Sequence, residues 1–342
     1  LSAEAQRPLS EHIDAFQLKM QTAGRSTKHI ERTVNFCKQT AEAAGFKTAA
    51  DVTADAVHKV AGSLSERWAA RTVAARLQAI KSLTRWLWRE GKLAADPLAG
   101  VLKPNPKADR RRERRMLLQE EWTWLRSVTL AENEEREGMP AAERVLLYAV
   151  AVQTGLRASE LRILTRRRLF LDNGRPFITC PGAGTKNRKD ARQYIRRETA
   201  AELAAHIATK TPGAPVFAMP TEYDTADMLR DDLAAARAAW IDAAKSDPQE
   251  HLRREQSDFL AAVNHEREHI DFHSLRHTCG AWLAIAGVHP NIIKTVMRHS
   301  VITLTMDTYG HLMPDDTADA IDKLPNMTAG EPIGLKVAGA TG

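Results

Sequence analysis

The chain has 342 residues, of which 43% are apolar and 27% are charged, a balance that is typical of a globular protein with two domains. No apolar run approaches the ~18 residues of a membrane span, and no signal peptide is evident, so we expect a cytoplasmic protein that does not contact a membrane. The formal net charge of +6 favours a polyanionic partner. Because the first residue is Leu1 rather than Met, we expect that preceding residues have been removed.

The three cysteines are Cys37, Cys180 and Cys279. They are widely spaced and match neither a disulfide framework nor a metal-ligand motif. The pattern predicts buried thiols in a reducing compartment.

Residues 8–100 are predicted to form a helical domain. Apolar residues recur there at helical spacing in four segments, and Gly24 and Gly45 end the first two. The segments are 9–23, 26–44, a third that starts at Thr53 or Asp55, and 69–90. Opposite its apolar face, the fourth segment carries Arg71, Lys81, Arg85 and Arg89. These cations allow two interpretations, a solvated basic face or a surface that lies on DNA.

A basic linker is predicted at 101–117, following the glycines and prolines that forbid a long helix. Its run KADRRRERR, residues 107–115, would repel itself unless it met an anion. A flexible tether is the alternative, but basic features on both sides favour contact with DNA phosphates. The predicted contacts come from Lys107, Arg110, Arg111, Arg112, Arg114 and Arg115.

Residues 118–324 are predicted to form a second domain, and residues 325–342 a disordered tail. The expected helices begin at Glu120, span 141–154, follow a cap at Ser159, and continue from Thr199 with an Ala-rich stretch at 225–244. The mostly charged segment 246–268 shows no pattern that assigns an element.

A small β-sheet is expected within this second domain. The Asp172-Asn173-Gly174 turn between two apolar runs predicts a hairpin over 169–180, and residues 191–196 return as a third strand. The predicted fold class is therefore mainly α, with a small antiparallel β-sheet in the C-terminal domain.

Three motifs in the second domain carry residues that are suited to phosphate chemistry. The first is TGLRASEL at 154–161, the second is HSLRH at 273–277, and the third pairs His299 with Tyr309 ten positions later. Arginine and histidine can neutralise a phosphate, and a tyrosine hydroxyl can attack one. Because a free tyrosine has a pKa near ~10, it becomes a nucleophile only where cations and a base surround it.

In this order, with a lysine-bearing hairpin between the first two, the motifs resemble those of the tyrosine recombinase (phage integrase) family. The resemblance covers residues 118–315, and over 8–100 it rests on a helical domain in the expected place. It implies a helical core-type DNA-binding domain followed by a tyrosine-recombinase catalytic domain. The implied activity is site-specific DNA recombination, in which DNA is cleaved and rejoined through a 3′-phosphotyrosyl intermediate.

The resemblance implies a role for each motif residue. Arg157 and Arg276 would bind the non-bridging oxygens of the scissile phosphate, and His299 would donate a hydrogen bond to it. Tyr309 would be the nucleophile, and His273 would accept its proton.

A hairpin lysine is implied to protonate the leaving 5′ oxygen. Lys186 lies in the matching turn, and Lys189, three residues on, is the alternative. The covalent link conserves the energy of the phosphodiester, so rejoining needs no ATP. Fixed cations take the place of a metal ion, so no cofactor is expected.

The implied partner is double-stranded DNA, around which the two domains would close while the basic linker crosses the backbone. The implied assembly is a homotetramer on two DNA sites, and a monomer or weak oligomer without DNA. The segment 316–324 and the tail would dock on a neighbouring subunit.

One position departs from the family pattern. Arg298, directly before His299, stands where the family usually has glycine. It adds a cation close to the expected site and puts the local backbone geometry in question.

Three alternatives remain open. One is a type IB topoisomerase, which shares this chemistry but relaxes supercoils without a defined site. Another is a non-catalytic, sequence-specific DNA-binding protein. The third is a zinc hydrolase, because HEREH at 265–269 fits the H-E-x-x-H pattern, although its surroundings are mostly charged.

Overall fold

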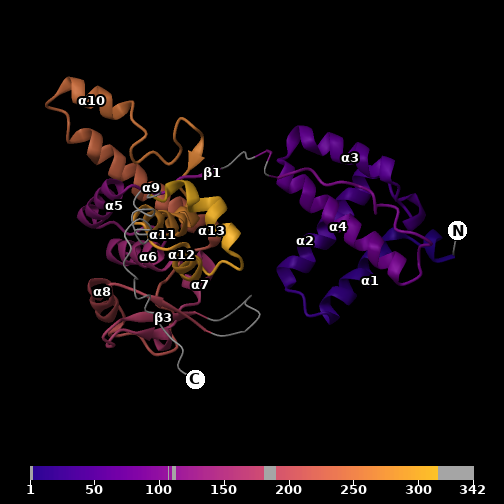
Figure 1. The fold of residues 1–342 in the computed structure, drawn as a ribbon, viewed down its shortest axis with the longest axis horizontal. Helices are drawn as coiled ribbons and strands as arrows, with labels where there is room; N and C mark the ends of the chain where they lie inside the picture. The colour runs from indigo at the N-terminus through magenta and orange to yellow at the C-terminus, as the bar shows by residue number, and fades with distance from the viewer. Residues whose placement is uncertain (1–2, 107, 110–112, 181–189, 315–342) are drawn as a thin grey trace, which may run out of the picture. The chain divides into compact units, whose positions relative to one another are not determined.

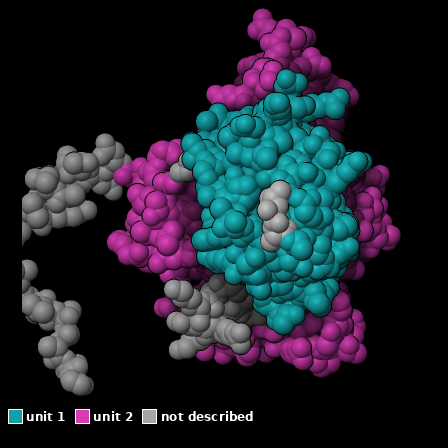
Figure 2. All heavy atoms as spheres, turned by 90° about the vertical axis from the view of Figure 1, so that its right-hand side faces the viewer, with its two compact units in different colours: residues 1–112 teal, residues 113–342 magenta. Residues whose placement is uncertain are grey.

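The computed structural model describes residues 3–106, 108–109, 113–180 and 190–314. The chain divides into two compact units, residues 1–112 and 113–342, which Figure 2 shows in different colours. Val101 lies in the core of unit 1 and Leu117 in the core of unit 2. The segment that belongs to neither core is therefore shorter than the predicted linker.

Unit 1 is a helical domain whose four main helices pack around one apolar core (Figure 1). The αL conformation of Gly45 (φ 70°) ends the second helix, and the Thr53 hydroxyl caps the third by accepting the N–H of Ala56 at 3.3 Å. The helices are α1 (Leu9–Thr22), α2 (Thr27–Ala44), α3 (Ala54–Arg67) and α4 (Ala70–Arg89), with short 3-10 turns η1 (Ala3–Gln6) and η2 (Ala49–Asp51). These helices agree closely with the predicted segments.

Unit 2 is mostly helical and has two apolar clusters. The larger cluster is built mainly by α5 (Gln119–Glu132), α6 (Ala141–Thr154), α9 (Glu222–Asp242) and α11 (Phe272–Ile285). The smaller one, around Tyr309, involves α11, α12 (Pro290–Met297) and α13 (Ile302–Tyr309). The remaining helices are α7 (Ala158–Arg162), η3 (Arg166–Arg168), α8 (Arg197–Ile207), α10 (Pro248–Glu255) and η4 (Gly310–Leu312).

The predicted antiparallel sheet is confirmed. Its strands are β2 (Leu169–Phe170), β3 (Phe177–Cys180) and β4 (Ala191–Tyr194), in the order β2-β3-β4. Phe170 pairs with Phe177, and their rings stack at 4.7 Å. The connection between β3 and β4, which carries Lys186 and Lys189, lies outside the described residues.

A second, parallel sheet joins β1 (Glu113–Arg114) to β5 (Glu268–His269). This sheet was not predicted, because two-residue strands are too short to show alternation of apolar and polar residues. Strand β5 contains the last two residues of the HEREH segment, so this segment is not a helix. Arg267 has φ 63°, and residue 269 is in an extended strand. The two histidines at 265 and 269 therefore do not share a helix face, and the zinc-hydrolase alternative loses its geometric basis.

The predicted cap at Ser159 is wrong. Arg157 is the N-cap of α7, and the carboxylate of Glu160 accepts the Arg157 N–H at 2.8 Å. A carboxylate three residues after the N-cap satisfies the free N–H there, so a serine inside the first turn is not needed.

Among the described residues, no helix combines the length and the hydropathy that crossing a membrane requires.

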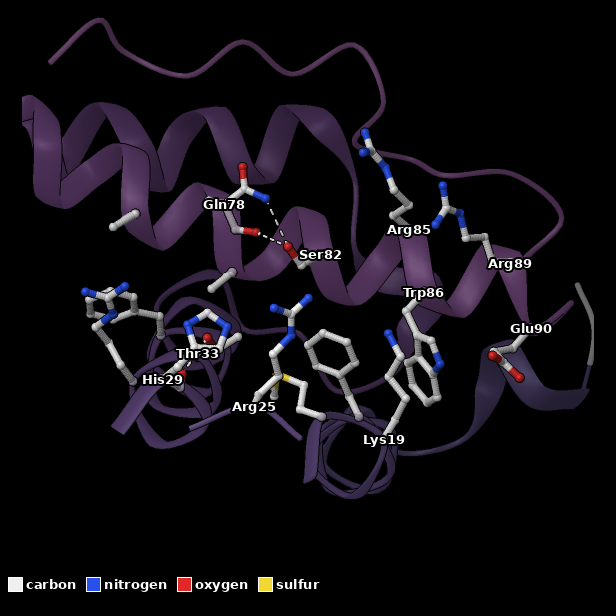
Figure 3. Close-up of a pocket in the computed structure, with 16 residues that line it drawn as sticks. Lys19, Arg25, His29, Thr33, Gln78, Ser82, Arg85, Trp86, Arg89 and Glu90 are labelled. Atoms are coloured by element: carbon white, nitrogen blue, oxygen red, sulfur yellow. Dashed lines mark hydrogen bonds between the residues drawn. The ribbon is translucent and has the colours of Figure 1, made fainter. Parts of the chain in front are cut away.

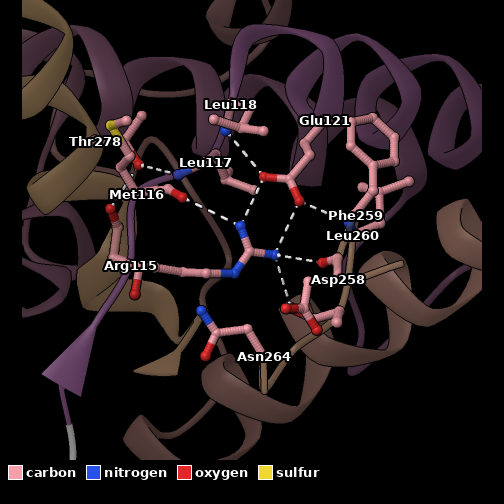
Figure 4. A network of polar contacts seen from close by, with 12 residues as sticks. Arg115, Met116, Leu117, Leu118, Glu121, Asp258, Phe259, Leu260, Asn264 and Thr278 are labelled. Carbon is pink, nitrogen blue, oxygen red and sulfur yellow. Dashed lines mark hydrogen bonds and ion pairs between the residues drawn. The ribbon is translucent and has the colours of Figure 1, made fainter. Parts of the chain in front are cut away.

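Arg115 anchors the start of unit 2 rather than facing outward (Figure 4). Its two terminal nitrogens donate to the two carboxylate oxygens of Glu121, both at 2.8 Å, and one also donates to the Ala261 carbonyl at 2.8 Å. Glu121 is fully buried and also accepts the backbone N–H groups of Leu118 and Leu260. Because Arg115 is only 12% exposed and both of its terminal guanidinium nitrogens are hydrogen-bonded within unit 2, the geometry argues against the predicted phosphate contact from this residue.

We expect Glu121→Gln to lower the free energy of unfolding of unit 2 by about 3–5 kcal/mol, because it leaves the buried Arg115 cation without its partner. The exposed neighbour gives a matched control, and Glu120→Gln should change stability by less than about 0.5 kcal/mol. Denaturant unfolding of both variants measures the difference. Equal effects of the two substitutions would show that the pair does not hold unit 2 together.

Candidate active site

Helix α11 supplies His273 and Arg276, and its start is held by two charged residues. Asp271 is the N-cap, and its side chain accepts the N–H of Ser274 at 3.1 Å. Arg114 of β1 pairs with the same carboxylate at 2.7 Å. His273 and Arg276 follow three residues apart, so they lie on the same side of the helix. The unpredicted β1–β5 pairing thus fixes the helix turn that carries His273.

Arg276 is buried, with 4% of its surface exposed, and it connects three helices. Its guanidinium donates to the carbonyl of Gly155, the C-cap of α6, and to the carbonyl of Met297, the last residue of α12. Carbonyls at a helix C-terminus lack partners within the helix and carry partial negative charge, so they suit a buried cation. Burial, followed by the charges of Arg157 and Arg298, lowers the pKa of Arg276 to about 10, which leaves it charged at neutral pH.

Arg157 is half exposed and lies at the N-terminus of α7. The Glu160 carboxylate lies 3.3 Å from its guanidinium. The charge of Arg157 lowers the pKa of Arg276, of His273 and of His299. The first and second motifs therefore meet in one electrostatic field, although Arg157 and His273 are 116 positions apart in the sequence.

Tyr309, the last residue of α13, is 3% exposed and lies directly on Gly280 of α11. A Cβ atom at Gly280 would be 2.3 Å from the ring carbon Cζ and 2.6 Å from the hydroxyl oxygen of Tyr309. The His277 ring lies at 5.3 Å from the Tyr309 ring, and the His299 ring lies parallel to it at 6.4 Å. Burial raises the pKa of Tyr309 to about 12, and the charge of Arg276 opposes this rise.

His273 and His299 are neutral at neutral pH, because each has a lowered pKa. Desolvation, followed by the charges of Arg114 and Arg276, lowers the pKa of His273. Desolvation and the charge of Arg276 likewise lower the pKa of His299. The Nδ1 atom of His299 lies 2.9 Å from the hydroxyl of the fully buried Thr305, which fixes the ring and leaves Nε2 for another partner.

The structure brings together five of the predicted catalytic residues: Arg157, His273, Arg276, His299 and Tyr309. The sixth, Lys186, and its alternative, Lys189, lie outside the described residues, as do the linker cations Lys107, Arg110, Arg111 and Arg112. The sequence reasoning missed Glu160, Gly280 and Thr305. Of these, only Glu160 carries a readable signal, its capping-box spacing from Arg157.

Comparison with known proteins agrees with this geometry. Residues 128–315, more than half of the chain, match the sequence model of the phage integrase family, and the chain belongs to that family. It is 27% identical over 242 residues to the tyrosine recombinase XerC of Mycobacterium tuberculosis, which is 70% of this chain and 72% of the relative.

Two solved structures show the same fold. A lambda integrase dimer bound to a COC′ core site has a TM-score of 0.62 at 13% identity and covers 87% of this chain and 97% of that chain. The Tn1549 transposon integrase in complex with a circular intermediate DNA has a TM-score of 0.63 at 15% identity and covers 94% of this chain and all of that chain.

The protein is therefore a tyrosine-type site-specific recombinase, an enzyme that breaks and rejoins DNA strands. The predicted fold class and reaction class are confirmed. The family match favours recombination over the topoisomerase and the non-catalytic DNA-binding alternatives.

We expect Gly280→Ala to lower the free energy of unfolding by about 1–3 kcal/mol, because the new methyl group overlaps the Tyr309 ring. Gly213→Ala is the control in the same unit, since open space surrounds a Cβ there. Thermal or denaturant unfolding distinguishes them. A stable Gly280→Ala protein would mean that Tyr309 does not rest on α11 in solution.

Proposed function

We propose that Tyr309 attacks a phosphodiester of double-stranded DNA and forms a 3′-phosphotyrosyl bond. The bond between phosphorus and the Tyr309 oxygen forms as the bond to the 5′ oxygen breaks. A second attack by a 5′ hydroxyl reverses the step and rejoins the DNA without ATP. The observation that carries this proposal is the position of Tyr309 close to the His277 and His299 rings and within the field of Arg276.

Arg157 and Arg276 are proposed to hold the non-bridging phosphate oxygens. The charge of Arg157 lies close enough to Arg276 to lower the pKa of Arg276. Two neighbouring cations are unfavourable alone, and an anion between them relieves the repulsion. The same charges stabilise the additional negative charge that develops as a fifth oxygen approaches phosphorus, which is the role a metal ion takes in other phosphoryl-transfer enzymes.

The two histidines are proposed to have separate roles. His273 is neutral, so it can accept the phenolic proton as Tyr309 attacks. His299, oriented by Thr305, can donate from Nε2 to the phosphate. Lys186 or Lys189 is proposed to protonate the leaving 5′ oxygen, which completes the proton balance of the cleavage step.

Tyr309 must leave its place on Gly280 to reach a phosphate, because it is buried in the described structure. Its short helix α13 has 8 residues and exposes apolar side chains, Leu304 at 47% and Met306 at 43%. A short helix with several exposed side chains can open locally at modest energetic cost. We propose that binding of DNA and of neighbouring subunits draws the Tyr309 end of α13 outward, while Thr305, one turn earlier, keeps its contact with His299.

Unit 1 is proposed to contact the DNA backbone through a basic hollow of about 600 Å³ between α1, α2 and α4 (Figure 3). Among the described residues that line it, one is acidic, Glu90. The cations are Lys19, Arg25, Arg32, Arg85 and Arg89, and the polar ring of His29 lies beside them. Lys81, from the predicted basic face, instead donates to the carbonyls of Ala99 and Val101.

The working assembly is proposed to be a homotetramer on two DNA sites, with a monomer or weak oligomer in the absence of DNA. A lambda integrase tetramer bound to a Holliday junction shares the fold of this chain, with a TM-score of 0.63 at 13% identity. The segment 316–324 is proposed to dock on a neighbouring subunit. Lys107, Arg110, Arg111, Arg112 and the half-exposed Arg114 are proposed to add phosphate contacts.

We expect Tyr309→Phe to bind target DNA with unchanged affinity and to form no covalent adduct, because only the attacking oxygen is removed. A nicked suicide substrate followed by denaturing gel electrophoresis measures the adduct. Tyr194→Phe, which alters a tyrosine that is 55% exposed, is the control and should form adduct normally. Adduct from the Tyr309 variant would assign the nucleophile to another residue.

The pH dependence of cleavage tests the base. Because the pKa of His273 lies below its usual value of about 6.5, the base form persists in mild acid, and we expect the adduct rate to stay level from about pH 8 to about pH 6. His273→Ala should lower the rate by about 100-fold or more, and the remaining rate should rise with pH as hydroxide replaces the base.

The exposed His265, altered to Ala, is the control and should keep the wild-type profile. An acid limb near pH 6.5 that persists in the His273 variant would remove His273 from this role.

A further inference from the structure

Arg298 occupies a backbone position that favours glycine. It is the C-cap of α12 and has a left-handed conformation, with φ 50°. A residue with a Cβ is strained there, whereas glycine is not. Its side chain nevertheless turns inward rather than to solvent, with 11% exposed. A strained residue with a buried charge needs an interaction that compensates for both.

The interaction that Arg298 makes is with Glu160 of α7. The Arg298 guanidinium donates to the Glu160 carboxylate, which is itself 19% exposed. This pair joins two segments that are 138 residues apart in the sequence. Burial alone raises the pKa of Glu160, but the hydrogen bonds from Arg298 and Arg157 outweigh this effect and lower the pKa.

The same carboxylate holds Arg157 in two ways. One oxygen accepts the Arg157 N–H at 2.8 Å, which fixes the start of α7, and the other lies 3.3 Å from the Arg157 guanidinium. Arg157 needs its guanidinium for the DNA phosphate. A carboxylate so close competes for that guanidinium and also repels the phosphate, unless a second cation shares its charge.

We propose that Arg298 is a positioning residue that takes up the charge of Glu160, so that the Arg157 guanidinium stays available to the scissile phosphate. The proposal rests on the role that the proposed function gives to Arg157. Glu160 then acts through its backbone contact, as the cap that aims Arg157. Arg298 itself does not contact the phosphate.

The surroundings of Arg298 support this role. The carbonyl of the preceding residue, Met297, accepts from Arg276, and the carbonyl of Val296 accepts from Gln193 of β4 at 3.2 Å. The end of α12 is therefore held from α11 and from β4, and Arg298 adds the contact with α7. Both phosphate-binding arginines thus depend on this one helix end, through Met297 for Arg276 and through Glu160 for Arg157.

Three variants test the proposal: Arg298→Gly, Glu160→Gln and the double variant. Glycine suits the left-handed backbone and removes the cation, whereas glutamine keeps an acceptor for the Arg157 N–H and removes the charge. With a suicide substrate at saturating concentration, Arg298→Gly should slow adduct formation by about tenfold or more, while DNA affinity changes little.

The double variant should recover the rate of Glu160→Gln alone, because Arg298 is not needed once the Glu160 charge is gone. Arg298→Lys should retain much of the wild-type rate, since lysine supplies the same charge. A purely structural role for Arg298 would lower the free energy of unfolding, which denaturant unfolding measures, but would leave the adduct rate of the folded, DNA-bound protein unchanged.

Three results would overturn the proposal. These are a wild-type rate for Arg298→Gly, a loss that the double variant does not recover, and a weaker DNA affinity with an unchanged rate at saturation. The last would mean that Arg298 contacts DNA directly.

A wild-type protein that forms no adduct would contradict the proposed function instead. Binding of inorganic phosphate, measured by 31P NMR without any cleavage, would then decide on Arg298. The proposal is supported if Arg298→Gly binds phosphate more weakly than the wild type and the double variant regains the affinity. Any other ranking of the phosphate affinities contradicts it.

Discussion

The site depends on one buried cation that is held by the ends of two helices. Arg276 donates to the carbonyls of Gly155 and Met297, so α6, α11 and α12 meet at its guanidinium. Gly155 is suited to this place, because its φ of 60° is left-handed and an added Cβ would lie 3.2 Å from the Met297 sulfur. Partial charges rather than a carboxylate support the cation, so its full charge remains for a phosphate.

Tyr309, the proposed nucleophile, has the opposite property, because its surroundings keep it buried. It lies against Gly280, and burial raises its pKa to about 12, so its hydroxyl is protonated and covered in the free protein. In the proposed mechanism, a phosphate bound by the two arginines brings the reaction partner, and His273 accepts the proton. The proposed reaction therefore requires DNA, which suits an enzyme whose uncontrolled cleavage would break the DNA strand it acts on.

Much of this arrangement could be predicted from the sequence. The motifs that resemble the tyrosine recombinase family single out Arg157, His273, Arg276, His299 and Tyr309 as candidates, and apolar periodicity locates the helices. Contacts between segments that are distant in the chain could not be predicted from the sequence. Arg115 looked like part of a basic run, but its partner Glu121 turns it inward. The charge of Arg298 was noticed, yet its pairing with a residue 138 positions away depends on the fold. Spacing alone also left a zinc-binding helix open as an alternative at HEREH, where a left-handed turn replaces the helix.

The most direct test of the account is a crystal structure of the protein with nicked target DNA and orthovanadate, which imitates a phosphate with five oxygen ligands. The account predicts a bond between the Tyr309 oxygen and vanadium, with the guanidinium groups of Arg157 and Arg276 donating to the equatorial oxygens. Vanadate bound to a different nucleophile, with Tyr309 still resting on Gly280, would contradict it.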